Sequence, residues 1–178
     1  MMVMPSGWSI PLDKLTVREI TLFGILGAMT FGAKYVMSGL PNIEPVSLMV
    51  MVFGAVFGKK AVWPVYLYVL LELLFYGPGT WNIMYLYIWP LLAAAAYCLR
   101  AMEGRLGWAL LSGGFGLLFG ALCIPVDVVI GGMGYAVTKW VSGIPFDVTH
   151  CIGNLVMALV LFVPLRNLTE KLYRQMKK

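Results

Sequence analysis

The residues best suited to chemistry lie between Ile144 and Asn154, where Asp147, His150 and Asn154 recur at i, i+3 and i+7. At 3.6 residues per turn, these side chains fall within about 60° of one helix face. His150 is the only histidine in the chain. An acid, an imidazole and an amide on one stripe can orient the polar groups of a small ligand. The same residues can also form a helix-packing network, with Asp147 serving the helix N-terminus.

Composition indicates the environment of this stripe. The 178 residues are 61% hydrophobic and 12% charged, with a mean hydropathy of +0.86. A soluble domain carries about twice that charged fraction. We therefore expect one membrane domain over residues 1–178. Ionisable residues inside a membrane cost roughly 2.5–3.5 kcal/mol each on insertion scales and normally face a bundle interior or a wet cavity. That cost favours a functional interpretation of Asp147 and His150.

The apolar segments predict an all-α integral membrane protein, a bundle of six transmembrane helices. Glycine, proline and charged loops separate these segments. Their expected bounds are about 16–38, 46–58, 61–76, 82–99, 106–130 and 145–166. The second is too short to cross an ordinary bilayer by itself and must lean on its neighbours or on a locally thinned bilayer. Residues 131–143 are expected to form a glycine-rich loop, Pro145 to begin the last helix, and a basic tail to follow Arg166.

Basic residues indicate orientation. With the N-terminus inside, eleven lysines and arginines lie on the cytoplasmic side, whereas Lys34 and Lys139 lie outside. This asymmetry follows the positive-inside rule. Both termini are therefore expected in the cytoplasm, with loops 39–45, 77–81 and 131–144 outside.

Polar and aromatic side chains concentrate on the expected outer half. Asn82, Tyr85 and Trp89 repeat the i, i+3, i+7 spacing on the fourth segment. Glu72 lies in the middle of the third segment, and its role can be either structural pairing or ligand contact. A single aromatic stripe usually marks an interfacial belt or a core, but stripes from several helices favour a mostly apolar pocket with a few polar groups. The candidate substrate-binding residues are Asn42, Glu44, Trp81, Asn82, Tyr85, Trp89, Asp127, Asp147, His150 and Asn154.

The first segment carries small residues four apart, at Gly24, Ala28 and Gly32. Such spacing lets another helix approach closely. The partner helix can belong to this bundle or to another subunit.

The sequence lacks the usual catalytic and cofactor motifs. Gly58-Lys59-Lys60 is the nearest approach to a phosphate-binding loop, but Phe53 stands at its first glycine position and a lysine at its last. One histidine excludes a chelating cluster, and the three cysteines lie singly. The basic residues are scattered, so no nucleic-acid partner is expected. We expect no metal, no catalytic residues and no cofactor of its own.

Four motifs carry a resemblance that covers nearly the whole chain, together with the order of the segments. They are Leu40-Pro-Asn-Ile-Glu-Pro-Val-Ser47, Phe57-Gly-Lys-Lys60, Tyr76-Gly-x-Gly79 with Tyr85-Leu-Tyr-Ile-Trp89, and Trp140-Val-Ser-Gly-Ile-Pro-Phe-Asp147. In these the chain resembles the substrate-binding S-components of energy-coupling factor (ECF) vitamin transporters, most closely the cobalamin type.

The resemblance implies a subunit of an ABC importer in a bacterial plasma membrane. It would capture its vitamin from outside, cobalamin or a related corrinoid being favoured. A transmembrane scaffold subunit and two cytoplasmic ATPases would complete the transporter, so this chain would not itself be an enzyme. The resemblance also implies that Gly24, Ala28 and Gly32 form the docking face for the scaffold. Members usually carry alanines four apart there.

Other functions remain open. The substrate can be another vitamin: riboflavin, pyridoxine, folate or a queuosine-type precursor. A self-sufficient small-molecule carrier is a second possibility, although no inverted repeat is detectable. An intramembrane enzyme is disfavoured, because Asp147 with His150 supplies only part of a catalytic set.

Overall fold

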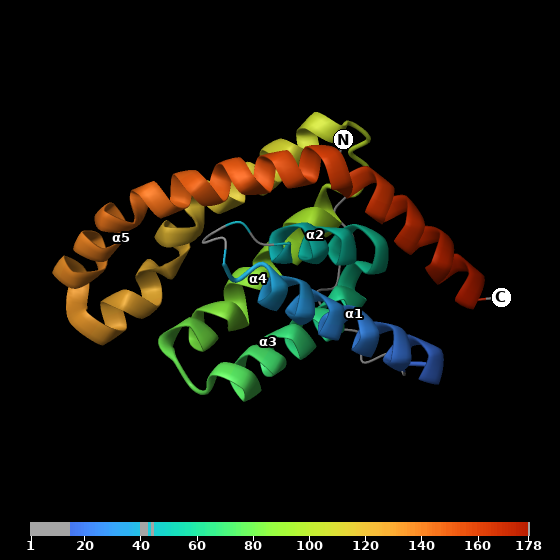
Figure 1. The fold of residues 1–178 in the computed structure, drawn as a ribbon, viewed down its shortest axis with the longest axis horizontal. Coiled ribbons are helices and arrows are strands. Elements are labelled where there is room, and N and C mark those ends of the chain that lie inside the picture. Colours follow the sequence, from blue (N-terminus) through green and yellow to red (C-terminus); the bar gives the residue numbers. More distant parts are fainter. Residues whose placement is uncertain (1–14, 40–42, 44, 178) are drawn as a thin grey trace, which may run out of the picture.

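The computed structural model describes residues 15–39, 43 and 45–177, and all their regular secondary structure is helical (Figure 1). The expected all-α class is therefore confirmed. The elements are α1 (Val17–Val36), α2 (Val46–Phe57), the 3-10 helix η1 (Gly58–Ala61), α3 (Val62–Tyr76), α4 (Thr80–Cys98) and α5 (Arg105–Met176).

The expectation of six separate helices is wrong, because segments 106–130 and 145–166 belong to one element, α5. Its backbone leaves the helical conformation at Gly132, with φ 78° and ψ 175°. A positive φ costs a glycine little, and α5 folds there into two arms that lie side by side (Figure 1). We call residues 105–131 the first arm and residues 133–176 the second arm.

The predicted loop at 131–143 is also wrong, since apart from Gly132 these residues are helical. Pro145 lies inside the second arm and does not begin a helix. The expected tail after Arg166 is likewise helical as far as Met176. The glycines at 131, 134 and 143 do not break the helix, because a glycine costs an α-helix only about 1 kcal/mol relative to alanine.

The other chain reversals follow the sequence signals. Gly58 and Gly77 both have positive φ, at the ends of α2 and α3. The predicted turn after Tyr76 is therefore confirmed.

Thr16 and Glu19 form a capping box at the start of α1, in which each side chain accepts a hydrogen bond from the other residue's backbone N–H.

Helix α2 lies at the centre of the molecule, and its residues Val50, Met51 and Phe53 are fully buried. It packs most extensively on α4 and also on α5. A Cβ added at Gly54 would strike the backbone of Ala93 on α4, so the glycine permits this close approach. Neighbouring helices therefore cover α2, the second predicted segment, which is too short to cross an ordinary bilayer by itself.

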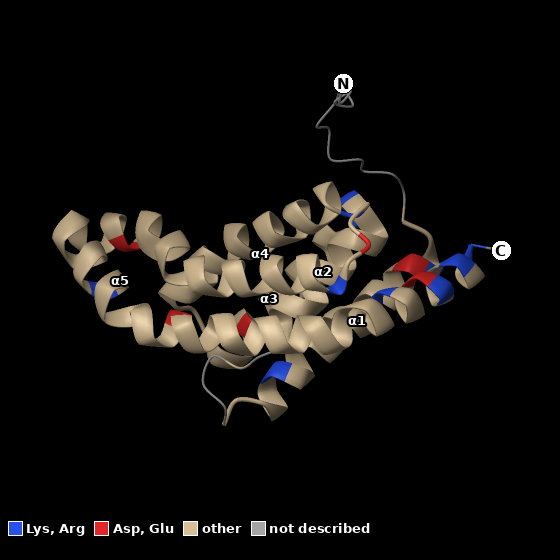
Figure 2. Ribbon diagram, turned by 90° about the horizontal axis from the view of Figure 1, so that it is seen from above, with Lys and Arg blue, Asp and Glu red and all other residues tan. Residues whose placement is uncertain are grey.

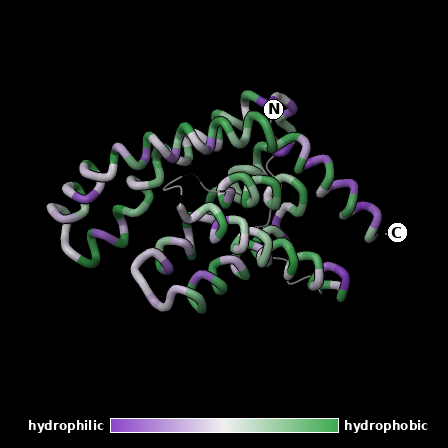
Figure 3. Tube along the Cα trace, viewed as in Figure 1, coloured by the Kyte–Doolittle hydropathy of each residue, from purple (hydrophilic) through white to green (hydrophobic). Residues whose placement is uncertain are grey.

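The surface is strongly apolar. Val129 is 87% exposed and Leu74 is 71% exposed, and Figure 3 shows hydrophobic residues over most of the bundle. Two helical stretches, Val46–Tyr76 and Arg105–Met176, are long and apolar enough to cross a membrane, by length and composition only. Figure 2 shows several lysines and arginines near the end of the molecule that carries the C-terminus.

Candidate functional site

The candidate site follows a row of aromatic rings that connects α3, α4 and both arms of α5. Ring centroids lie 6.3 Å apart for Tyr68 and Tyr85 and 5.3 Å apart for Tyr85 and Trp89. The row continues from Trp89 to Phe119 at 5.7 Å and from Phe119 to His150 at 5.1 Å. We call these five residues the aromatic row. Tyr85 packs on Trp89, and the ring of Phe119 thus links these two predicted residues to His150.

Asp147 and His150 both face the interior of the molecule, with exposed fractions of 7% and 4%. Asp147 Oδ1 accepts a hydrogen bond from the backbone N–H of Gly120 at 3.1 Å, but its Oδ2 has no partner. His150 Nε2 also has none. A Cβ at Gly116 would strike the backbone of His150, so this glycine lets the arms of α5 approach closely. The stripe inferred from residue spacing is therefore buried between the two arms.

Asn154, the third member of that stripe, contributes to helix packing. Its Nδ2 donates to Ser47 Oγ at 3.0 Å and to the carbonyl of Ser112 at 3.3 Å. These bonds join both arms of α5 to α2. The hydroxyl oxygen of Ser112 has no partner.

A buried ion pair lies at the other end of the aromatic row. Lys34 Nζ of α1 is 2.8 Å from Glu72 Oε2 of α3, and 3.3 Å from the hydroxyls of both Tyr68 and Tyr85. Glu72 is only 2% exposed, and its Oε1 has no partner. Sequence reasoning left Glu72 open and read Lys34 only as an outer cation. The i, i+4 spacing of Tyr68 and Glu72 is the sequence signal that could have found this cluster.

The remaining predicted residues are dispersed. Asn82 Oδ1 accepts from the backbone N–H of Gly79 at 2.7 Å and so caps α4, whereas its Nδ2 has no partner. Trp81 is 44% exposed. Asp127 pairs with Lys139 at 2.6 Å across the Gly132 kink. The predicted residues Asn42 and Glu44 lie outside the described residues.

In the part of the chain that the structure describes, six buried side-chain atoms lack a hydrogen-bond partner. They are Glu72 Oε1, Asn82 Nδ2, Trp89 Nε1, Ser112 Oγ, Asp147 Oδ2 and His150 Nε2. Leaving a buried polar group unsatisfied costs about 1–3 kcal/mol, and nearly all such groups in native proteins find partners. Four of the six belong to residues predicted for the binding site: Asn82, Trp89, Asp147 and His150.

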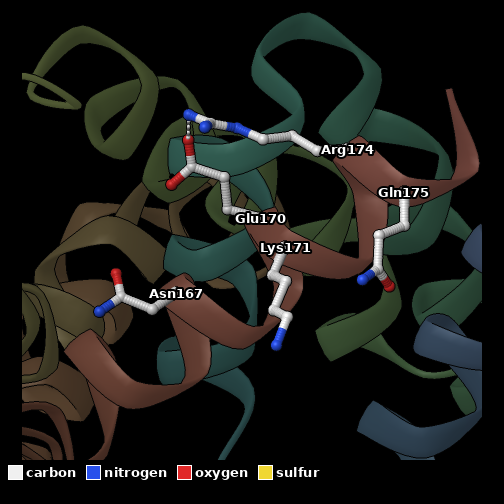
Figure 4. Close-up of a pocket in the computed structure, with 5 residues that line it drawn as sticks. All are labelled: Asn167, Glu170, Lys171, Arg174 and Gln175. Carbon is white, nitrogen blue, oxygen red and sulfur yellow. Dashed lines mark hydrogen bonds and ion pairs between the residues drawn. The ribbon is translucent and has the colours of Figure 1, made fainter. Parts of the chain in front are cut away.

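The opposite end of the molecule is charged. Glu19 Oε1 of α1 accepts from Lys60 Nζ and from the Tyr173 hydroxyl, both at 2.8 Å. Burial and the bond to Glu19 raise the pKa of Tyr173. A shallow hollow nearby is lined by the side chains that Figure 4 labels on α5, among which Glu170 and Arg174 form an ion pair. No aromatic side chain lines that hollow, so it does not fit the mostly apolar pocket expected.

The small residues of α1 face away from the bundle. Ala28 is exposed, and a Cβ added at Gly24 or Gly32 would meet nothing within 4 Å. On the opposite side, a Cβ at Gly27 would lie 3.0 Å from Leu67 and from the carbonyl of Pro64. Among the described residues, Gly24 and Gly32 therefore do not serve packing inside this chain.

Comparisons with protein-family models, with curated proteins and with solved structures found no match. Within the described residues, no group of three His, Cys, Asp or Glu side chains is placed to hold a metal ion.

Proposed function

We propose that this chain is the substrate-binding S-component of an ECF-type vitamin importer in a bacterial plasma membrane. In this proposal the two arms of α5 count as separate membrane segments, giving six, with both termini in the cytoplasm. The exposed apolar surface and the basic C-terminal end support that placement. Cobalamin or a related corrinoid is the substrate that the sequence resemblance favours.

The unpartnered polar atoms along and beside the aromatic row carry this proposal. A ligand that reaches Trp89, Asp147 and His150 would supply the hydrogen bonds that these buried atoms lack. The geometry favours binding over catalysis, because Asp147 bonds to the backbone N–H of Gly120 and His150 Nε2 is left without an orienting partner.

The open face of α1 supports the proposed docking of a scaffold subunit. The scaffold subunit would pack on Gly24, Ala28 and Gly32, where small residues let helices approach closely. Docking and toppling in the membrane would then release the substrate inside. Release requires the docked and free subunit to differ in affinity for it, since a ligand bound equally in both states would not be moved.

Substitution at the buried stripe tests substrate binding. We expect Asp147→Ala and His150→Ala to weaken binding at least about tenfold, the equivalent of one charge-assisted hydrogen bond, without loss of expression. Mass spectrometry of the gently purified subunit would identify the retained ligand, and isothermal calorimetry would then compare the variants. Glu170→Ala, at the opposite end, is the matched control. Unchanged isotherms for both stripe variants would remove these residues from the site.

Reconstitution separates an S-component from a self-sufficient carrier. We expect uptake into liposomes only when the scaffold and ATPase subunits and ATP are present. Transport by this chain alone would support the carrier.

A further inference from the structure

We propose that the end of the molecule that carries the C-terminus binds an anionic phospholipid, with the lipid phosphate between the start of α1, η1 and the end of α5. This site goes beyond the proposed function, and it rests only on the placement of this end at the cytoplasmic surface of the membrane. The ligand class is a phosphodiester head group that carries acyl chains.

A hollow of about 480 Å³ lies where these three elements meet, and its lining residues differ from those labelled in Figure 4. Its volume is within the usual range of ligand pockets. Arg18 Nη1 donates to the carbonyl oxygen of Met176 at 3.0 Å, so the start of α1 lies beside the end of α5 (Figure 1, Figure 2). Arg18 of α1, Lys60 of η1 and Tyr173 of α5 all line the hollow. Segments far apart in the sequence therefore form one site.

The charge of this hollow is positive. Arg18, Lys60 and Lys177 line it together with one carboxylate, that of Glu19. Glu19 Oε1 accepts hydrogen bonds from Lys60 Nζ and from the Tyr173 hydroxyl, both at 2.8 Å, and its Oε2 is engaged in the capping box of α1. Glu19 is only 5% exposed, whereas Arg18 and Lys177 are exposed. An anion that enters the hollow therefore meets an excess of two positive charges.

The cations carry the donors that phosphate oxygens accept. The guanidinium of Arg18 presents five N–H groups in a planar fork that fits phosphate, and its bond to Met176 holds this fork beside the hollow. Lys177 Nζ lies 4.4 Å from the centroid of the Tyr173 ring. Specific contacts thus position both exposed cations, as a binding site requires and a solvated basic surface does not.

An apolar surface adjoins the cations and favours a lipid over a free anion. Val17, which also lines the hollow, is 80% exposed, and Ile20 is 56% exposed. Residues three apart are neighbours on a helix surface, so an acyl chain can lie along α1 while the phosphate enters the hollow. Basic pockets on the cytoplasmic side of membrane helices bind anionic head groups in this way.

The ring of Tyr173 is not available to stack on a nucleobase. It is only 8% exposed, its centroid lies 4.9 Å from that of Phe57, and Lys177 Nζ lies over it. Stacking on aromatic rings supplies much of the affinity of proteins for bases. A nucleotide would therefore gain little here beyond the contacts of its phosphate.

Lipid titration in a neutral detergent tests the site on the purified full-length chain. Native mass spectrometry would compare dioctanoyl phosphatidylglycerol with dioctanoyl phosphatidylcholine, and inorganic phosphate would be added as a competitor. We expect phosphatidylglycerol to bind at least about tenfold more tightly than phosphatidylcholine, whose choline cation cancels the charge of its phosphate. Equal binding of the two lipids would overturn the proposal. Displacement of phosphatidylglycerol by an equal concentration of inorganic phosphate would also overturn it, in favour of a free-anion site.

Substitutions then locate the head group. Arg18→Gln and Lys177→Gln should each weaken the binding of phosphatidylglycerol about fivefold, which is the contribution of one cation at a membrane surface. Both side chains are exposed, so we expect both variants to fold. Arg105→Gln is the matched control, because Arg105 is an exposed cation on the same expected side of the membrane and outside the hollow. Equal effects of the three substitutions would indicate charge attraction without a site and would refute the assignment.

Substrate binding and complex assembly, measured on the same variants, distinguish this inference from the function beneath it. Loss of the lipid preference with intact substrate binding and uptake would overturn the lipid site and leave the S-component assignment standing. Selective binding of phosphatidylglycerol without any coupled uptake would support the lipid site and count against the S-component. Poorer recovery of the ATPase subunits with Arg18→Gln, at unchanged lipid binding, would assign the hollow to a protein partner and overturn the proposal.

Discussion

Enlarging Gly32 on the open face of α1 should weaken partner docking and leave the fold intact. A Cβ at this position meets nothing within 4 Å, so Gly32→Leu places its side chain outside the bundle. Leucine is also a better helix former than glycine by roughly 1 kcal/mol. We therefore expect the thermal stability of the isolated subunit to stay constant or to rise slightly.

The effect on docking follows from the lost close approach. Inserting a large side chain into a tightly packed contact costs about 1–3 kcal/mol. At about 1.4 kcal/mol for each tenfold change in affinity, the complex with the scaffold should weaken by about 5- to 140-fold. Substrate binding should be unaffected, because Gly32 lies on the outer surface of α1, away from the aromatic row.

The assay compares co-purification of the tagged subunit with its scaffold and ATPases, substrate binding by calorimetry, and uptake in proteoliposomes. Gly27→Leu is the matched control on the same helix, since its Cβ would already lie 3.0 Å from Leu67. That variant should lose thermal stability, substrate binding and docking together. Normal recovery of scaffold with Gly32→Leu would refute the assignment of this face.

Two further predictions concern stability. Gly54→Ala should destabilise the bundle by about 1–3 kcal/mol, because its Cβ would strike the backbone of Ala93. Gly114→Ala is the control and should not destabilise the bundle, since a Cβ there meets nothing within 4 Å. Thermal unfolding of the two variants would check this, and equal unfolding midpoints would contradict it. Burial and the bond to Glu19 raise the pKa of Tyr173 above 10, so the neutral phenol is favoured in the folded state. Its stabilising contribution is therefore complete below pH about 10 and is lost as the pH rises above that value; Tyr173→Phe should flatten this alkaline loss in thermal unfolding, and an unchanged pH profile would exclude the effect.

Sequence periodicity predicted the buried stripe because helix geometry alone places Asp147, His150 and Asn154 on one face. It did not separate their roles. Asn154 bonds to Ser47, a residue 107 positions away, and no local pattern reveals such a contact. Asp147 lies against Gly120, and His150 lies against Gly116 and the ring of Phe119, contacts that local spacing does not reveal.

The helix count failed at the glycine-rich stretch for a different reason. Turn propensity gives each glycine the same weight, although in a packed helix pair only one position needs a positive φ. Gly132 takes that conformation, whereas Gly131 and Gly134 remain helical. The sequence analysis also missed the contact of Tyr173 with Glu19, because it ended the last segment near Arg166 and treated the residues beyond it only as a basic tail.

Helix α1 connects the two activities that the proposed function requires. Its outer side carries the small residues that a scaffold would contact, and its inner side carries Lys34, which touches both Glu72 and Tyr85. Tyr85 packs on Trp89, so a displacement of α1 on docking would reach the aromatic row through direct contacts. A change at Lys34 would alter the ion pair that anchors Glu72 and the contact with Tyr85. Docking can thus lower substrate affinity without a contact between the scaffold and the substrate, and by linkage the bound substrate must weaken docking by the same factor.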